Sequence, residues 1–169
     1  MKRLFLILII ALLNTGQLSA QATFESAEIS FLFVSKDVDG TIGGFESDSE
    51  IHLDDLTNSR INGSVAVESL KTGIFLRDWS LKSGKYFDED EFPRISFEST
   101  SVVERDNGFK VSGKLTIKGT SKNIAVDFVR NGNQMTGKIT LYSSDYGINI
   151  KSKREDNLVE VELVLNLRP

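Results

Sequence analysis

The sequence predicts an all-β domain, built as a sandwich or a barrel, and two observations lead to this fold class. Apolar residues recur at every second position through most of the chain, which is the period of a strand with one buried face. Short sequences rich in Gly, Asn and Asp separate these alternating runs, and these residues suit hairpin turns because they tolerate positive φ. Many short strands at near-regular spacing are typical of sandwiches and barrels.

The N-terminal residues stand apart from this pattern and have the layout of a secretory signal peptide. Lys2-Arg3 precedes the unbroken apolar run 4–13, and Ala20-Gln21-Ala22 resembles a cleavage site. We therefore expect a signal peptide over 1–22, a β-barrel domain over 23–169, and a periplasmic or secreted protein. The apolar run is short for a bilayer span, so we expect no stable membrane insertion after cleavage; an uncleaved anchor is the alternative.

Within the mature chain, the alternation gives the strands in order. They are expected over 27–33, 61–68, 95–103, 109–118, 124–128, 135–141 and 159–167. Hairpin chemistry follows at Asp39-Gly40, Gly43-Gly44, 106–108, 118–120 and 131–133.

One long connection, 72–92, lacks clean alternation. Its apolar spacing suggests one or two short helical turns near 74–83, and the acidic run 88–91 before Pro93 is expected to be a solvated loop. Long connections in compact domains are often functional.

Composition excludes several kinds of protein. Without Lys2 and Arg3, the 20 basic residues become 18 against 24 acidic ones, and the net charge changes from −4 to −6. A chain of this charge has no electrostatic reason to bind nucleic acid. It contains no cysteine, so disulfides, thiol chemistry and an N-terminal lipid-modified cysteine are excluded.

Catalytic motifs are also missing. His52 is the only histidine, and its place between Ile51 and Leu53 predicts an outward-facing surface residue. A Cys/His metal site cannot be built, and no nucleophile elbow, P-loop or dinucleotide-binding motif occurs. The sequence therefore predicts a protein that is not an enzyme and that uses no metal or cofactor.

Residue size on the inward face bears on whether a barrel interior would be open. An eight-stranded barrel is wide enough for side chains or for one ligand. Small residues would leave space, or they would accommodate close packing and bulges, and the sequence leaves both interpretations open. The small residues expected to face inward are Ser47, Ser49, Gly63, Ser99, Ser101, Gly113 and Gly137.

Three ordered motifs resemble the YceI-like polyisoprenoid-binding proteins over nearly the whole mature chain. The first comprises Thr72-Gly73, Arg77-Asp78, Leu81-Lys82-Ser83, Tyr86-Phe87-Asp88 and Phe92-Pro93 with Ile95 and Phe97. The second runs from Val111 to Lys122, and the third from Ser144 to Ile148. Two features differ: Ser80 replaces the family's usual histidine, and the first mature strand has no tryptophan.

The resemblance implies an eight-stranded antiparallel lipocalin-like barrel around an apolar tunnel. It implies an exported protein that holds a long-chain apolar lipid, polyisoprenoid or quinone-like, for carriage, storage or sequestration. The alternatives are a non-catalytic structural or interaction barrel with a filled core, possibly a homodimer, and a small hydrolase or isomerase, for which we find no inward-facing acid–base pair.

The residues expected to form the site fall into two groups. The apolar wall is expected from Phe31, Phe33, Phe45, Val65, Val67, Phe97, Ile117, Phe128 and Ile139. The mouth and head-group candidates are Arg77, Asp78, Trp79 and Phe87. Arg77 and Asp78 would either fix the 72–92 segment in place or meet a polar head group. Trp79 would be a buried lid or an exposed anchor.

Overall fold

A computed structural model describes residues 21–106 and 108–168. The predicted signal peptide lies outside these residues except for Gln21 and Ala22, which begin the first strand. The strands are β1 Gln21–Phe33, β2 Val38–Ile42, β3 Ile51–His52, β4 Asn62–Ala66, β5 Arg94–Arg105, β6 Gly108–Ile117, β7 Thr120–Asn131, β8 Gln134–Tyr142 and β9 Leu158–Arg168.

The helical elements are short. They are the α-helix α1 Phe75–Lys82 and the 3-10 turns η1 Val34–Lys36, η2 Leu56–Asn58, η3 Val67–Ser69, η4 Ser143–Tyr146 and η5 Arg154–Asn157. The helical turns predicted near 74–83 are therefore confirmed. Among the helices of the described ranges, none is long and apolar enough to cross a membrane.

The sheet is antiparallel and curls into a nearly closed barrel of eight strands. Their order is β2-β1-β9-β8-β7-β6-β5-β4, and the two-residue β3 pairs with the start of β1. The segment 43–50, which follows β2, closes the barrel against β4: Glu46 and Ser64 exchange two backbone hydrogen bonds of 2.8–2.9 Å, and Glu50 and Arg60 exchange two more. The predicted barrel is confirmed, and the sandwich is excluded.

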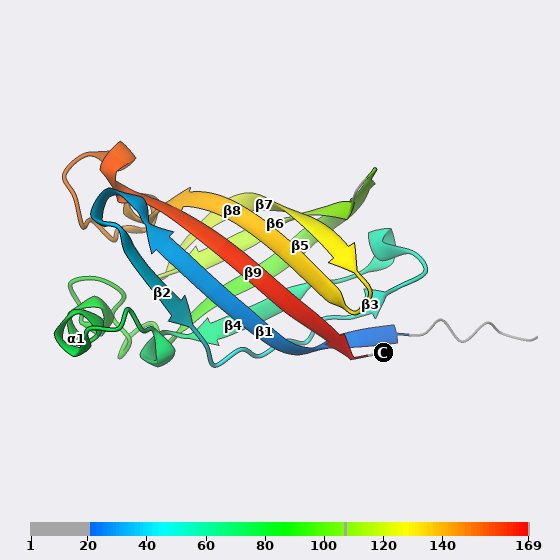
Figure 1. The fold of residues 1–169 in the computed structure, drawn as a ribbon, viewed down its shortest axis with the longest axis horizontal. Helices are drawn as coiled ribbons and strands as arrows, with labels where there is room; N and C mark the ends of the chain where they lie inside the picture. The colour runs from blue at the N-terminus through cyan, green and yellow to red at the C-terminus, as the bar shows by residue number, and fades with distance from the viewer. Residues whose placement is uncertain (1–20, 107, 169) are drawn as a thin grey trace, which may run out of the picture.

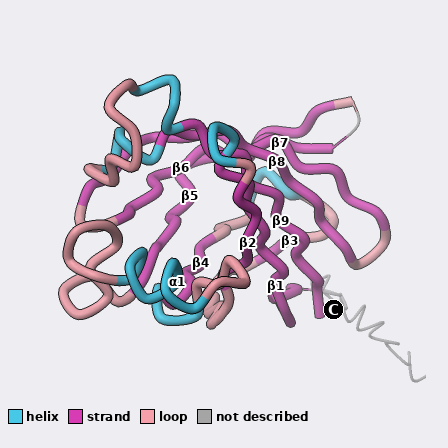
Figure 2. The backbone as a smooth tube through the Cα atoms, turned by 60° about the vertical axis from the view of Figure 1, so that its left-hand side comes forward, coloured by secondary structure: helices cyan, strands magenta, loops and turns pink. Residues whose placement is uncertain are grey.

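The two ends of the barrel differ. α1 lies at one end, and β3 with the C-terminus lies at the other (Figure 1). Seen from another side, β5 and β6 lie across the barrel from β1 and β9 (Figure 2).

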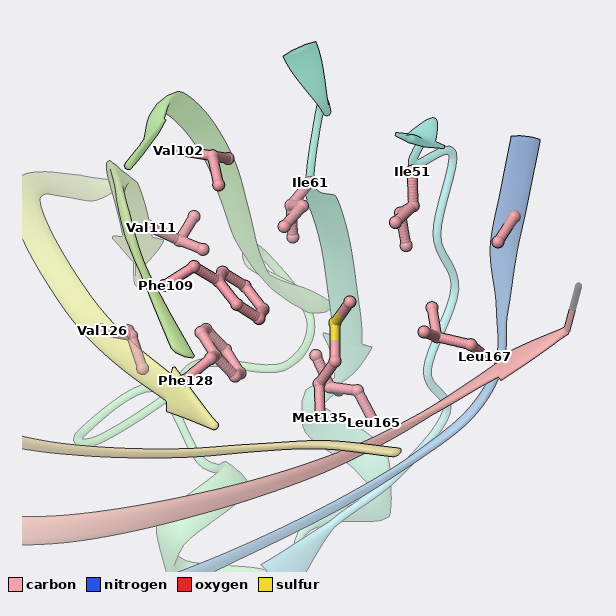
Figure 3. Packing of buried hydrophobic residues seen from close by; sticks show 11 residues of the cluster. Ile51, Ile61, Val102, Phe109, Val111, Val126, Phe128, Met135, Leu165 and Leu167 are labelled. Carbon is pink, nitrogen blue, oxygen red and sulfur yellow. The ribbon is translucent and has the colours of Figure 1, made fainter. Parts of the chain in front are cut away.

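The end near β3 is filled by the main hydrophobic core. Phe109 and Phe128 stack there with ring centroids 5.4 Å apart and planes inclined by 10°. Figure 3 shows these rings beside Met135 and Leu165, with Ile51 and Leu167 nearby. Phe109 and Met135 are fully buried, so this end is closed by side chains from β1, β3 and β5 to β9, together with Ile61 just before β4.

A β-bulge corrects one part of the predicted alternation. The register between β5 and β6 shifts between Ser99 and Ser101, and a bulge adds one residue that reverses the faces beyond it. Val102 is therefore buried, whereas Ser101 and Val103 are exposed. The inward position predicted for Ser101 is therefore wrong.

Candidate functional site: an apolar cavity in the barrel

A cavity of about 650 Å³ occupies the barrel between the closed end and α1. Its volume lies within the ~300–1,000 Å³ range usual for small-molecule sites. Each of the eight barrel strands contributes to its wall. The lining from β1, β2 and β4 includes Phe24, Ile29, Phe31, Phe33, Val38, Ile42, Gly63 and Val65. The lining from β5 to β9 includes Ile95, Phe97, Leu115, Ile117, Ile124, Val126, Phe128, Ile139, Leu141, Val159, Val161, Leu163 and Leu165.

The cavity exists although its wall contains large aromatic side chains, because several of these rings lie against glycines. A Cβ atom on Gly40 would come within 2.4 Å of the Phe31 ring, and one on Gly137 would come within 2.5 Å of the Phe128 ring. In both cases the ring belongs to the residue paired with that glycine on the neighbouring strand. The glycines thus accommodate rings along the wall, and the rings leave the barrel axis open.

Rings also lie against two further inward glycines, although here the ring does not belong to the residue paired with the glycine. A Cβ atom on Gly113 would meet the Phe97 ring at 2.4 Å, and one on Gly63 would meet the Phe45 ring at 3.0 Å. Both interpretations of the small residues are therefore partly right: they allow close packing within the wall, and an open interior is the result.

The segment 72–92 crosses the open end of the barrel and is held at both sides. At its start, Lys71 and Thr41 of β2 exchange two backbone hydrogen bonds of 2.9 Å. Further along, Lys118 in the β6–β7 turn donates from Nζ to the carbonyl oxygen of Gly84 at 2.9 Å. Leu81 and Phe87 pack inward against a small core of Ile42, Val65 and Leu70.

Arg77 and Asp78 both bind Thr72. The Arg77 guanidinium donates from Nε to Thr72 Oγ1 and from Nη2 to the Thr72 carbonyl oxygen, each at 2.6 Å. Asp78 Oδ1 accepts from the Thr72 backbone N–H at 2.8 Å and from its hydroxyl. Both side chains therefore fix the start of the segment, while Arg77 also lines the cavity.

On the opposite side of the mouth, η4 and η5 are joined by an ion pair. Arg154 donates to both carboxylate oxygens of Asp145 at 2.7 and 2.6 Å and stacks on the Tyr142 ring at 3.7 Å. These hydrogen bonds hold the pKa of Asp145 below its usual value. Burial, with a smaller effect of Asp145, raises the pKa of Tyr146, which lines the cavity as a neutral phenol.

The polar lining is sparse and carries positive charge. Lys36 and Arg77 are the charged residues in the wall, and no Asp or Glu lines it within 21–106 and 108–168. Over the same ranges, no group of three His, Asp or Glu residues comes together as a metal site. His52 of β3 pairs with Gln21 of β1 and is half-buried at the closed end.

Most of the predicted site residues meet in this cavity. Eight of the predicted wall residues line it: Phe31, Phe33, Phe45, Val65, Phe97, Ile117, Phe128 and Ile139. Val67 is not among them, which corrects that prediction. β4 ends at Ala66, and Val67 begins the η3 turn, where it is buried and its backbone N–H donates to the Pro93 carbonyl oxygen.

At the mouth, Arg77 and Phe87 line the cavity but Asp78 and Trp79 do not. The Trp79 side chain is 69% exposed, so it is not a buried lid. Ser80, in the position of the family's usual histidine, does line the cavity.

Several wall residues were not assigned to the site from the sequence. The β9 residues Val159, Val161, Leu163 and Leu165 form a large part of the lining. These residues alternate along the sequence. The alternation places them in the cavity wall once it is known that β9 lies between β1 and β8. Lys36 and Tyr146 lie in turns, where no periodic signal indicates direction.

An antiparallel barrel with one packed end, an apolar cavity and a helix at the open end defines the lipocalin-like class of barrels. Solved structures show the same fold. BcnA of Burkholderia cenocepacia superposes with a TM-score of 0.72 at 18% identity, covering 85% of this chain and 96% of that one. A polyisoprenoid-binding domain from Saccharophagus degradans superposes with a TM-score of 0.61 at 13% identity, covering 88% and 97%.

The sequence comparisons narrow this class to a family. The model of the YceI-like domain matches residues 17–168. A UPF0312 protein of Staphylococcus aureus strain N315 is 35% identical over 139 residues, which cover 76% of this chain and 78% of the relative. The chain belongs to the YceI-like family, as its three motifs predicted.

Proposed function

We propose that this protein binds a long-chain apolar lipid, polyisoprenoid or quinone-like, inside its barrel and carries, stores or sequesters it outside the cytoplasm. The observation that carries the proposal is the 650 Å³ cavity, whose wall is apolar on all eight strands. Burying apolar ligand surface there contributes roughly 25 cal/mol per Å², which offsets the entropy lost by an ordered chain. The Saccharophagus degradans neighbour, described as polyisoprenoid-binding, supports this ligand class.

The direct test is to purify the protein from its own host, extract it with solvent and identify the extract by mass spectrometry. We expect an isoprenoid or quinone near one molecule per chain. An extract that stays empty after incubation with total membrane lipid would contradict the proposal and favour an interaction barrel. A turnover of any extracted compound would instead support the enzyme alternative.

A variant with a filled cavity tests whether the ligand occupies the barrel interior. Val161 lines the cavity, whereas Val164 on the same strand pairs with Glu28 and does not line it. We expect Val161→Phe to reduce the bound lipid severalfold and Val164→Phe to leave it unchanged. Equal retention by both variants would place the lipid elsewhere.

Export is part of the proposal, and the structure suggests the cleavage position to test. Ala22 is fully buried, pairs with Ile51 and belongs to the core of the closed end. Cleavage after Ala22 would remove a core residue, so we expect the released protein to begin at Gln21. N-terminal mass spectrometry of protein from the extracellular or periplasmic fraction checks this; a start at Thr23 would contradict it.

A further inference from the structure

The outer face of α1 exposes large apolar side chains beside the cavity mouth. Phe75 is 79% exposed, Leu76 73%, Trp79 69% and the adjacent Ile74 54%. We call these four residues the α1 apolar patch. Exposed aromatic and aliphatic residues gathered in one place mark an interaction site, because folding normally buries them.

The same helix has an inner face that belongs to the ligand cavity. Arg77, Ser80 and Leu81 line the cavity. Trp79 follows Leu76 by three positions and Phe75 by four, which is the spacing of neighbours on one helix face. The thickness of this one helix therefore separates the cavity from the exposed patch.

The patch is not required to hold α1 in place. The start of the segment is fixed by the hydrogen bonds of Arg77 and Asp78 to Thr72, and its later part by Lys118 to Gly84. Leu81 supplies the apolar contact with the barrel. The apolar character of the outer face thus serves something other than folding.

We propose that the α1 apolar patch inserts into the surface of a lipid bilayer, so that the cavity mouth faces the membrane during loading and release. This inference rests on the proposed function, because a long-chain apolar lipid resides in a bilayer and must leave it to reach the cavity. Trp, Phe and aliphatic side chains suit the boundary between head groups and acyl chains. The indole of Trp79 can keep its N–H hydrated there while the rest of the ring enters the apolar layer.

The charges around the patch determine which membrane it fits. Within the segment 72–92, the basic residues Arg77, Lys82 and Lys85 are outnumbered by Asp78 and the acidic run 88–91. The whole chain also has a negative net charge, −4. Electrostatic attraction to anionic lipid is therefore small, and we expect binding to neutral phosphatidylcholine that changes little with salt.

A second copy of the chain fits the patch less well. Four side chains of this size expose on the order of 500 Å², whereas a stable interface buries about 800 Å² per partner. A shallow membrane contact requires no complementary protein surface.

The chain contains its own reporter for this contact, because Trp79 is its only tryptophan. The protein, in the form its host produces, is mixed with phosphatidylcholine vesicles that have either ordinary or brominated acyl chains. We expect the Trp79 emission to shift to shorter wavelength on ordinary vesicles and to lose at least about half its intensity on brominated ones. Emission that stays unshifted and unquenched at saturating lipid would overturn the proposal.

Matched variants locate the effect. Phe75→Ser with Leu76→Ser should reduce vesicle partitioning on the order of tenfold or more, given the apolar area removed. Val103→Ser with Val129→Ser changes exposed apolar residues outside the α1 apolar patch (44% and 57% exposed) and should leave partitioning unchanged. Equal loss of partitioning in both variants would contradict membrane docking. So would a lipid-free sample that sediments as a dimer and already has blue-shifted Trp79 emission.

Binding of a short, water-dispersed prenol separates this inference from the proposed function. If the Phe75→Ser, Leu76→Ser variant binds the prenol normally but partitions poorly, both proposals stand. Prenol binding without quenching of Trp79 in the unmodified protein overturns only docking. Quenching without prenol binding overturns lipid carriage and the loading role that rests on it.

Discussion

The two ends of the barrel use similar residues for opposite results. At the closed end, Phe109 and Phe128 are directly paired on the neighbouring strands β6 and β7 and stack face to face, so two rings fill the space there. Toward α1, Phe31 lies against Gly40 and Phe45 against Gly63, and the interior stays open. An inward phenylalanine therefore fills the barrel on the side where a second ring faces it and leaves space on the side where a glycine does, and Phe128, between Phe109 and Gly137, marks the boundary between the two regions.

Removing a ring from each end should give the largest effect and tests this comparison directly. Phe109 is fully buried, so Phe109→Ala is expected to lower the free energy of unfolding by about 3–5 kcal/mol. Phe31→Ala should cost roughly half as much, because one side of that ring already faces open space and lacks partner atoms. Urea denaturation measures both; equal losses would show that the two ends are equally packed.

Adding a methyl group under a wall ring should have the next largest effect. Gly137→Ala places a Cβ atom 2.5 Å from the Phe128 ring, and displacing that ring is expected to cost about 1–3 kcal/mol. Gly43→Ala is the control, because its nearest contact would be Ser69 at 3.7 Å. If Gly137→Ala melts like the unmodified protein, the ring has room to move and the glycine is not needed.

At the mouth, Arg77 distinguishes a structural role from recognition of a head group. Arg77→Ala removes two hydrogen bonds to Thr72 and is expected to lower stability by about 1–2 kcal/mol, with a smaller effect on lipid affinity. Lys36→Ala removes the other charged residue of the lining and should leave stability unchanged. Unchanged melting of Arg77→Ala with lost binding would assign Arg77 to the head group.

The smallest effect is expected from the ion pair between η4 and η5. Because Arg154 lowers the pKa of Asp145, the pair stabilises the fold above the unfolded-state pKa of about 4 and is lost as pH falls through the lower folded-state value. Asp145→Asn should lower Tm at pH 7 by only ~1–3 °C, since the pair is partly exposed. The difference should shrink as the pH falls below about 4; a difference that stays constant there would exclude this cause.

Alternation and turn residues, which are local signals, predicted a sandwich or a barrel, and the resemblance of the three motifs to the YceI-like family implied the barrel. The sequence did not predict the reversal after Ser99, because a bulge is set by pairing between strands and leaves no mark in the period. Val67 continues the alternation of its strand in sequence, yet the chain turns at Ala66 to meet Pro93. Trp79 was equally compatible with a lid and an anchor, because helical spacing alone does not say which face meets the barrel.

The closure of the barrel between the segment 43–50 and β4 has a mechanical consequence. The ladder between β1 and β9 has ten paired positions, whereas this join has isolated backbone pairs at Glu46 and Glu50, together with side-chain hydrogen bonds such as those from Ser47 and Ser49 to the Asn62 carbonyl oxygen. A sheet that opens does so along its least connected line, because fewer bonds must break together. We therefore expect any widening of the barrel around a long ligand to begin at this seam and not along a continuous strand ladder.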